Sequence, residues 1–215
     1  MIIEAVCFDM DGTLIRNTDS VRYLCTLNDN LAALERIELL ESQRVITWIE
    51  ADYLKAELIK GLKLDRVEDR FQYDIDLIQN VEQVLAYLRG RGIQSVLITA
   101  GPVQVASILG AKFGFDGVYA SLYEVKDREF TGRILTHLGG DGKLNCLKEF
   151  CTTNGIGPDR CVAIGDSDSD IPIFKACGMS IAINYSDSVK GEASEYIMTD
   201  DLGDVVKLLE SWSPV

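Results

Sequence analysis

Histidine is almost absent from this chain: His137 is the only one among its 215 residues. Zinc sites that use two histidine ligands and the HExxH motif of metalloproteases are therefore excluded, and a Ser-His-Asp triad has one candidate base. His137 lies in HLGGDGK, a stretch typical of a loop, and we expect it at the surface because loops are mostly solvated.

Positive charge is also scarce. The chain has 21 lysine and arginine residues against 34 aspartate and glutamate residues, which gives a formal net charge of −13. Because such a charge repels nucleic acid and anionic membranes, we expect neither as a partner. It also repels phosphate, so a phosphate site in this chain requires local cations that reverse the sign of the field.

Long apolar runs are missing, although apolar residues make up 47% of the chain, enough for a large core. No run approaches the roughly 18 residues that a membrane helix needs. A strand-like segment begins at Ile2 and leaves no room for a signal peptide, so we expect a cytoplasmic protein. The six cysteines form no CxxC pair, and we expect reduced, buried thiols.

Short apolar runs and helical patterns alternate along most of the chain. Nearly continuous apolar runs are typical of strands buried on both faces of a parallel sheet, and they cover residues 2–8, 93–98, 160–164 and 179–183. Apolar residues at helical spacing predict helices over 81–92, 102–113, 143–153, 170–177 and 202–211. This alternation predicts an α/β fold, a doubly wound parallel sheet with a Rossmann-like core.

The interval between the first strand and the helix at residue 81 breaks the alternation. At roughly 70 residues it far exceeds an ordinary βα loop. It contains no proline and has helical spacing of apolar residues, which predicts an all-α cap over 16–76 inserted into a core of 1–15 and 77–215. Since ligands bind at the carboxyl ends of strands in such sheets, the cap is expected to cover a site there.

Two shorter segments also depart from the alternation. Residues 121–134, SLYEVKDREFTGRI, alternate between apolar and polar on either side of KDRE, which predicts a small β-hairpin. The tail SWSPV, residues 211–215, is expected to be a frayed end.

Polar residues follow three of the predicted strands directly. Asp9 and Asp11 follow the first strand, Thr99 and Ala100 follow the second, and an acidic run begins after the third at Asp166. Because the carboxyl ends of parallel strands share one edge of the sheet, we expect these residues to meet there. A buried carboxylate is costly unless a charge compensates it, so a cation is expected as well.

These residue types suit phosphate chemistry. Asp9 and Asp166 form an oxygen donor set for a hard divalent cation such as Mg²⁺, which binds one or two carboxylates plus substrate phosphate. Lys143, which opens the helix before the third strand, would add positive charge. The Thr99 hydroxyl and the Ala100 amide are candidate donors to phosphate oxygens.

The paired aspartates suit two different roles. A carboxylate beside a cation can attack phosphorus and form an aspartyl phosphate. The carboxylate two residues further on can protonate the leaving alcohol and then take a proton from water. Crowding with a like charge under a cap raises a carboxyl pKa, which suits Asp11 to the acid role. The pattern favours phosphoryl transfer, in which charge stabilisation supplies most of the catalysis.

These motifs, in this order, resemble the haloacid dehalogenase superfamily of phosphohydrolases. The residues that carry the resemblance are Asp9–Thr13 (DMDGT), Thr99, Lys143, and Gly165, Asp166 and Asp170 of GDSDSD. The resemblance spans the chain, with a helical cap where the family's first cap class has one. It implies that Asp9 is the nucleophile and Asp11 the general acid and base. It also implies that Mg²⁺ is bound by Asp9, Asp166 and the backbone carbonyl of Asp11, with Asp170 in support.

Within the superfamily, the cap length, the hairpin and the run GDSDSDIPIFKACG resemble phosphoserine phosphatases. The implied partner is a small phosphorylated metabolite such as phosphoserine, and the enzyme is expected as a monomer or homodimer. That branch uses a cap glutamate and a cap arginine to hold the amino and carboxylate groups of its substrate, and neither has an obvious counterpart here. The candidate substrate contacts are Asp19, Arg44, Lys55 and Ser169.

Other functions stay open at this point. The chain is alternatively a phosphatase for a sugar phosphate or nucleotide, a phosphomutase, or a non-catalytic protein that binds a phosphorylated metabolite. A dehalogenase is disfavoured, because an aspartate at the position of Asp11 marks phosphate chemistry in the family that the chain resembles.

Overall fold

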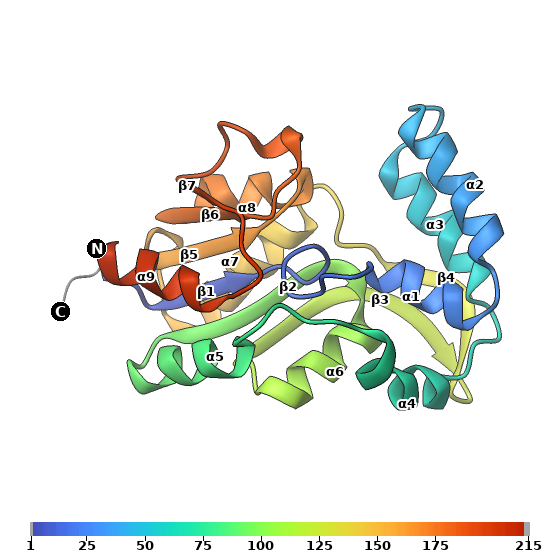
Figure 1. Cartoon of the computed structure of the whole chain (residues 1–215), viewed down its shortest axis with the longest axis horizontal. Helices are drawn as coiled ribbons and strands as arrows, with labels where there is room; N and C mark the ends of the chain where they lie inside the picture. The colour runs from blue at the N-terminus through green and yellow to red at the C-terminus, as the bar shows by residue number, and fades with distance from the viewer. Residues whose placement is uncertain (1, 213–215) are drawn as a thin grey trace.

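A single seven-stranded sheet runs through the part of the chain that the computed structural model describes, residues 2–212 (Figure 1). Its strands are β1 (Ala5–Phe8), β2 (Gln94–Pro102), β3 (Gly117–Lys126), β4 (Glu129–Thr136), β5 (Cys161–Gly165), β6 (Met179–Ile183) and β7 (Glu195–Ile197). They lie in the order β4-β3-β2-β1-β5-β6-β7. Every neighbouring pair is parallel except β3 and β4, which are antiparallel.

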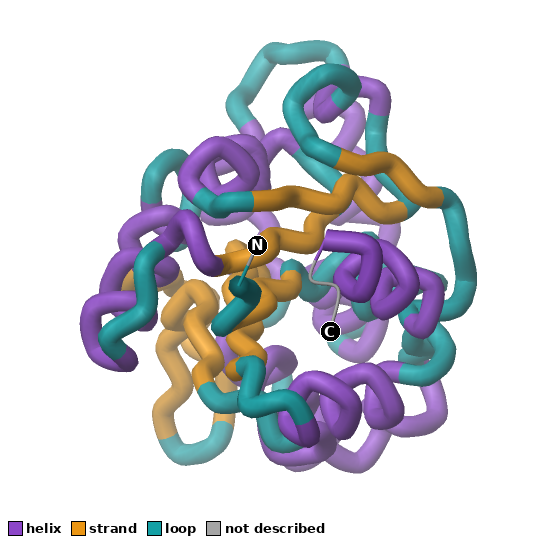
Figure 2. The backbone as a smooth tube through the Cα atoms, turned by 90° about the vertical axis from the view of Figure 1, so that its left-hand side faces the viewer, coloured by secondary structure: helices purple, strands orange, loops and turns teal. Residues whose placement is uncertain are grey.

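Helices cover both faces of this sheet, as Figure 2 shows with strands in orange between helices in purple. The helices of the α/β part are α5 (Val81–Gly90), α6 (Val103–Phe113), α7 (Gly142–Asn154), α8 (Ile171–Ala176) and α9 (Gly203–Trp212), with short 3₁₀ turns at Pro158–Arg160, Asp168–Asp170 and Asp187–Val189. One apolar cluster joins Val6 and Phe8 to α5, α6 and α9. A second joins Ala5 and Cys7 to α7 and α8. Alternate residues of β1 therefore pack on opposite faces, and the predicted doubly wound α/β fold is confirmed.

Four further helices lie between β1 and α5, and we call them the helical segment: α1 (Ser20–Leu27), α2 (Leu31–Ser42), α3 (Trp48–Leu58) and α4 (Leu64–Asp74). The helices α2 and α3 stand side by side away from most of the sheet (Figure 1). Asp19 caps α1 by accepting from the Arg22 amide, and Thr47 and Glu50 form a capping box at α3. The division into cap and core at residues 16 and 76 stays a prediction.

The predicted hairpin is present as β3 and β4. Asp127 and Arg128 at its tip both have positive φ, 50° and 62°, as a two-residue hairpin turn requires. Gly132 of β4 lies under α3: a Cβ there would come within 3.3 Å of the Glu57 Cα. The hairpin is thus the surface on which the helical segment packs.

The structure differs from the sequence-based prediction at several element ends. β1 begins at Ala5 rather than Ile2, and β2 continues beyond Ile98 to Pro102 through a register shift against β3. The short edge strand β7 was not predicted. Ser211 and Trp212, expected to be frayed, belong to α9, while the rest of that predicted tail lies outside the described residues.

Burial of the cysteines is confirmed for four of the six. All six cysteines are free thiols; Cys146 and Cys177 are partly exposed, and the other four are buried. No helix in the described part of the chain is both long enough and apolar enough to cross a bilayer.

Candidate active site

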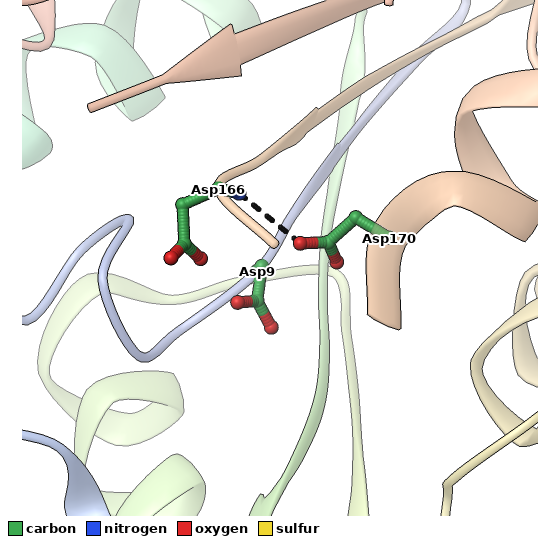
Figure 3. A group of neighbouring side chains, drawn as sticks. All are labelled: Asp9, Asp166 and Asp170. Atoms are coloured by element: carbon green, nitrogen blue, oxygen red, sulfur yellow. Dashed lines mark hydrogen bonds between the residues drawn. The ribbon is translucent and has the colours of Figure 1, made fainter. Parts of the chain in front are cut away.

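Three carboxylates meet at the carboxyl edge of the sheet (Figure 3). Asp9 follows β1, Asp166 follows the neighbouring strand β5, and Asp170 ends the short turn before α8. One oxygen from each carboxylate lies within 4.8 Å of the others. Asp9 and Asp170 are 5% and 3% exposed, so this charge is gathered in a nearly closed site.

The backbone of the loop holds Asp170 in place. Its Oδ2 accepts from the amides of Asp166, at 3.1 Å, and Ser167, at 3.2 Å; Figure 3 marks the first of these bonds. Gly165 is required beside it, because a Cβ there would lie 2.3 Å from the Asp170 carboxyl carbon. The acidic run therefore folds back on itself and presents Asp166 and Asp170 to the same space.

Lys143, in the first turn of α7, supplies the opposite charge. Its Nζ donates to Asp9 Oδ1, Asp170 Oδ1 and Ser169 Oγ, each at 2.8 Å, and the residue is 1% exposed. Burial lowers the pKa of Lys143, but the charges of Asp170 and Asp9 outweigh burial and raise the pKa overall. The lysine therefore stays charged, orients the Asp9 carboxylate and favours its ionised form.

One lysine does not balance the acidic groups around it. Burial, followed by the charge of Asp170, raises the pKa of Asp9; burial, followed by the charge of Asp9, raises the pKa of Asp166. Asp166 Oδ1 is buried and has no hydrogen-bond partner among the described residues. Hard oxygen donors with an unpaired oxygen fit a divalent cation such as Mg²⁺. Three of the predicted metal ligands, Asp9, Asp166 and Asp170, are thus close together. Metal binding by them and by the backbone carbonyl of Asp11 stays a prediction.

Asp11 is held separately from this group by the start of α1. Its Oδ1 accepts from the Ser20 amide at 2.7 Å, and its Oδ2 accepts from the Ser20 hydroxyl at 2.5 Å. Burial, followed by the charge of Asp19, raises the pKa of Asp11 to about 8. The carboxyl is therefore largely protonated at neutral pH, the state that a general acid needs.

Gly12 explains the glycine of the DMDGT motif. It has a φ of +78°, and a Cβ there would lie 2.3 Å from Asp166 Oδ2. Only glycine allows the turn after Asp11 to pass so close to the end of β5.

Thr99 and Ala100 lie where β2 shifts register against β3, between Ile98 and Pro102. The Thr99 Oγ1, in a residue that is 1% exposed, accepts from the Gly101 amide at 3.0 Å, so the hydroxyl hydrogen is available to another acceptor. A Cβ on Gly101 would come within 2.8 Å of Asp11 Oδ2, which brings this turn next to the paired aspartates. Bulges of this kind often redirect a strand beside an active site. Phosphate binding by Thr99 and Ala100 stays a prediction.

The four candidate substrate contacts lie in four different surroundings. Asp19 lines an opening together with Asp11 and Asp166. The Lys55 side chain is 12% exposed and lies 2.8 Å from Glu41 and 3.7 Å from Asp52. Ser169 bonds Lys143 at 2.8 Å and also lines a cavity of about 290 Å³, whose other lining residues are Glu41, Trp48, Ser167 and Asp168. Arg44 is exposed in the turn between α2 and α3.

His137 is not the surface residue that its loop suggested. Its side chain is 5% exposed, and its Nε2 lies 2.9 Å from Asp52 Oδ2 on α3. The rings of Trp48 and Tyr53 lie 5.3 and 5.7 Å from the imidazole. The prediction was wrong because the loop after β4 runs beneath α3, a contact between distant segments that the local sequence does not reveal.

Sequence reasoning also missed Ser20, Asp52 and Tyr123. Ser20 fixes both oxygens of Asp11, Asp52 bonds His137, and Tyr123 of β3 is buried with no hydrogen-bond partner for its hydroxyl among the described residues. The serine directly after a cap residue was a usable signal, because a first-turn hydroxyl and amide commonly hold a carboxylate. No local pattern marked the other two.

Known proteins match the chain along most of its length. Residues 6–175 match the family described as haloacid dehalogenase-like hydrolase. A phosphoserine phosphatase of Albidiferax ferrireducens is 23% identical over 98% of this chain and 90% of its own length. One of Methanocaldococcus jannaschii is 24% identical over 96% of this chain and 98% of its own length.

A third relative is more similar in sequence. It is a Mycobacterium leprae protein, named as a hydrolase, and is 32% identical over 90% of this chain and 71% of its own length. Among solved structures, a substrate-bound phosphoserine phosphatase complex has a TM-score of 0.85 at 23% identity, over 97% of this chain and 99% of that one, a likeness of fold. The chain belongs to the haloacid dehalogenase-like hydrolase family, as its four motifs predicted.

Proposed function

We propose that the protein is a Mg²⁺-dependent phosphomonoesterase that hydrolyses a small phosphorylated metabolite through an aspartyl phosphate on Asp9. The observation that carries this proposal is the contrast between two neighbouring carboxyl groups. Burial raises the pKa of both groups, but the buried ammonium of Lys143, 2.8 Å from Asp9, opposes the rise there, so the pKa of Asp9 is raised to about 6 and that of Asp11 to about 8. A nucleophile and a proton donor thus stand two residues apart.

The metal ligands in this proposal are Asp9, Asp166 and the backbone carbonyl of Asp11, with Asp170 in support. When bound, Mg²⁺ supplies positive charge that offsets the carboxylates and the substrate phosphate. The unpaired Asp166 Oδ1 and the closely spaced oxygens of the three aspartates support this assignment.

In the first step, an Asp9 carboxylate oxygen bonds to phosphorus while the bond from phosphorus to the ester oxygen breaks. The Asp11 carboxyl gives its proton to that departing oxygen, which leaves as an alcohol. Lys143, the Thr99 hydroxyl and the Ala100 amide are the groups assigned to the phosphoryl oxygens, where preorganised donors lower the barrier.

In the second step, Asp11 works in reverse. It takes a proton from a water molecule as the water oxygen bonds to phosphorus and the bond between Asp9 and phosphorus breaks. Inorganic phosphate leaves, and both carboxyl groups return to their starting states. Because Ser20 bonds both Asp11 oxygens, the carboxyl keeps one orientation during both transfers.

For the substrate we propose a phosphorylated amino acid such as O-phosphoserine. Relatives at 23% and 24% identity carry the name phosphoserine phosphatase. Asp19 and Lys55 offer an anion and a cation for the ammonium and carboxylate of such a substrate, and Ser169 lies beside Lys143. Arg44, exposed between two helices, has no part in this proposal.

Phosphate release tests the proposal. The purified protein is incubated with O-phosphoserine, glycerol 1-phosphate, glucose 6-phosphate, AMP and phenyl phosphate, each with Mg²⁺ and with EDTA. We expect Mg²⁺-dependent release, highest for O-phosphoserine, that Asp9→Asn abolishes. Equal release with EDTA, or no release from any ester, would contradict it.

A further inference from the structure

The opening that Asp19 shares with Asp11 and Asp166 is a cavity of about 510 Å³, and Arg16 also lines it. In the proposed mechanism, Asp11 gives its proton to the ester oxygen, so the first atoms of the leaving group lie against this carboxyl. A leaving group attached to that oxygen therefore extends into the opening, where the side chains on the walls can recognise it.

Apart from the metal site, the other charged groups on these walls already have partners. Both oxygens of Asp11 accept from Ser20, and the pKa of Asp11, raised to about 8, keeps this carboxyl largely neutral at pH 7. Asp19 Oδ1 accepts from the Arg22 amide at 2.7 Å, and the Arg22 side chain bonds Glu38. The protein itself thus compensates most of the charge at this opening.

Arg16 differs from these groups because its cation has no close anion. Its Nη1 donates to the Gly12 carbonyl at 2.7 Å, which holds the guanidinium against the turn after Asp11. The carboxylate that pairs with it among the described residues is Asp200, 3.9 Å from Nη2 and 85% exposed, and such a pair contributes little. The Arg16 Nε has no hydrogen-bond partner within residues 2–212. The fold therefore fixes this side chain, which is 27% exposed, without saturating it.

The chemistry of a guanidinium decides which group it can recognise. Its N–H groups lie in one plane that matches a carboxylate, and its charge repels an ammonium group. The formal net charge of −13 disfavours an anionic leaving group elsewhere on this protein, so such a group needs a local cation. The wall formed by Arg16 therefore favours a leaving group that carries a carboxylate.

We propose that Arg16 pairs with a carboxylate on the leaving group of the substrate and so selects phosphate monoesters of small hydroxy acids. This inference rests on the proposed function and narrows its substrate class. O-phosphoserine belongs to the class through its carboxylate, whereas esters of neutral or cationic alcohols gain nothing from Arg16. The contact is additional to the one proposed for Lys55, which lies 2.8 Å from Glu41.

The test compares four esters whose leaving groups differ in charge. O-phosphoserine carries a carboxylate and an ammonium group, phosphoglycolate a carboxylate, O-phosphoethanolamine an ammonium group, and glycerol 1-phosphate neither. For Arg16→Met, kcat/KM should fall roughly 10- to 100-fold for the two carboxylate esters, mainly through KM, the value of one charged hydrogen bond. The other two esters should change less than about 3-fold, since they lose no such bond.

Two further variants separate the charge of Arg16 from its bond to Gly12. Arg16→Gln keeps a side-chain donor for the Gly12 carbonyl and removes the charge, so the preference for phosphoglycolate over glycerol 1-phosphate should fall as in Arg16→Met. Arg16→Lys keeps the charge without the planar fork and should recover part of that preference. Arg66→Met, an exposed arginine on α4 that does not line the opening, is the matched control and should keep the wild-type preference.

Three results overturn the inference. An equal fall for all four esters assigns Arg16 only to holding the turn after Asp11. An unchanged preference in both Arg16→Met and Arg16→Gln refutes the contact, while hydrolysis by the wild-type protein leaves the proposed function intact. Absence of hydrolysis by the wild-type protein across the panel removes the proposed function and this inference with it.

Discussion

The sheet edge and the helical segment opposite it hold their polar groups in different ways. At the sheet edge, Asp9, Lys143 and Asp170 are almost fully buried, and the Lys143 ammonium bonds both carboxylates at 2.8 Å. On the helical side, Asp52 bonds His137, a residue 85 positions away, beside exposed Trp48 and Tyr53. In the mechanism that we propose, strand ends set the chemistry, whereas the contacts available to a leaving group depend on how helices pack on the hairpin. Substitutions on the two sides should therefore affect different kinetic constants.

The largest effect is expected from Asp9→Asn at the sheet edge. The amide cannot act as the attacking carboxylate, so kcat should fall on the order of 10⁴-fold or more, measured by phosphate release. Asp159→Asn, an exposed aspartate near the start of β5, is the matched control and should keep wild-type activity. Substantial turnover by Asp9→Asn would remove Asp9 as the nucleophile.

Lys143→Met should lower kcat roughly 10²- to 10³-fold, because it removes a preorganised donor from the site. It also leaves buried carboxylates without their cation, so the free energy of unfolding should fall by about 3–5 kcal/mol, measured by urea denaturation without metal. Lys148→Met, exposed on the same helix, is the control. Wild-type stability in Lys143→Met would show that Asp9 and Asp170 do not need this ammonium.

The pH dependence should respond to Asp19 on the helical side. As the general acid, Asp11 must be protonated, so activity should fall as pH rises through its pKa, about 8 by burial and the nearby charge of Asp19. Asp19→Asn removes that charge and keeps a residue that can cap α1. The alkaline limb of kcat/KM should therefore move to lower pH. An unchanged limb, or a shift to higher pH, would contradict the acid role.

The smallest effects are expected from substitutions of Lys55 and Arg44, and these two should differ in how much they change KM. Lys55→Met removes a partly buried cation near Asp52 and should raise KM for O-phosphoserine roughly 10-fold, the loss of a charged contact. Arg44→Ala changes an exposed turn and should stay within about 2-fold. A larger effect of Arg44→Ala on KM would mean that the turn between α2 and α3 closes over the substrate.

The contrast between the sheet edge and the helical segment also explains which parts of the site could be predicted from the sequence. Asp9, Asp166 and Thr99 each follow an apolar run, and parallel strand ends share one edge, so their meeting could be expected from the order of strands and helices alone. Lys143 could be identified because it has the position of the lysine in the order of the family's motifs. These signals are local, or need only the topology of a parallel sheet.

The rest depends on contacts between distant segments. The burial of His137 requires α3 above the loop after β4. The extension of β2 to Pro102 depends on pairing with Ser121 of β3. No local period encodes such tertiary pairing, so the sequence could not show how the candidate substrate contacts are placed, and their role stays a prediction.

The most direct test of the central claim is to trap the covalent intermediate. The wild-type protein is mixed with O-phosphoserine and Mg²⁺, quenched in acid within milliseconds, digested and analysed by mass spectrometry. We expect a phosphoryl group on the peptide that contains Asp9, localised to that carboxylate and absent from the Asp9→Asn variant. Phosphate release without any phosphorylated peptide, or phosphorylation of another residue, would contradict the account.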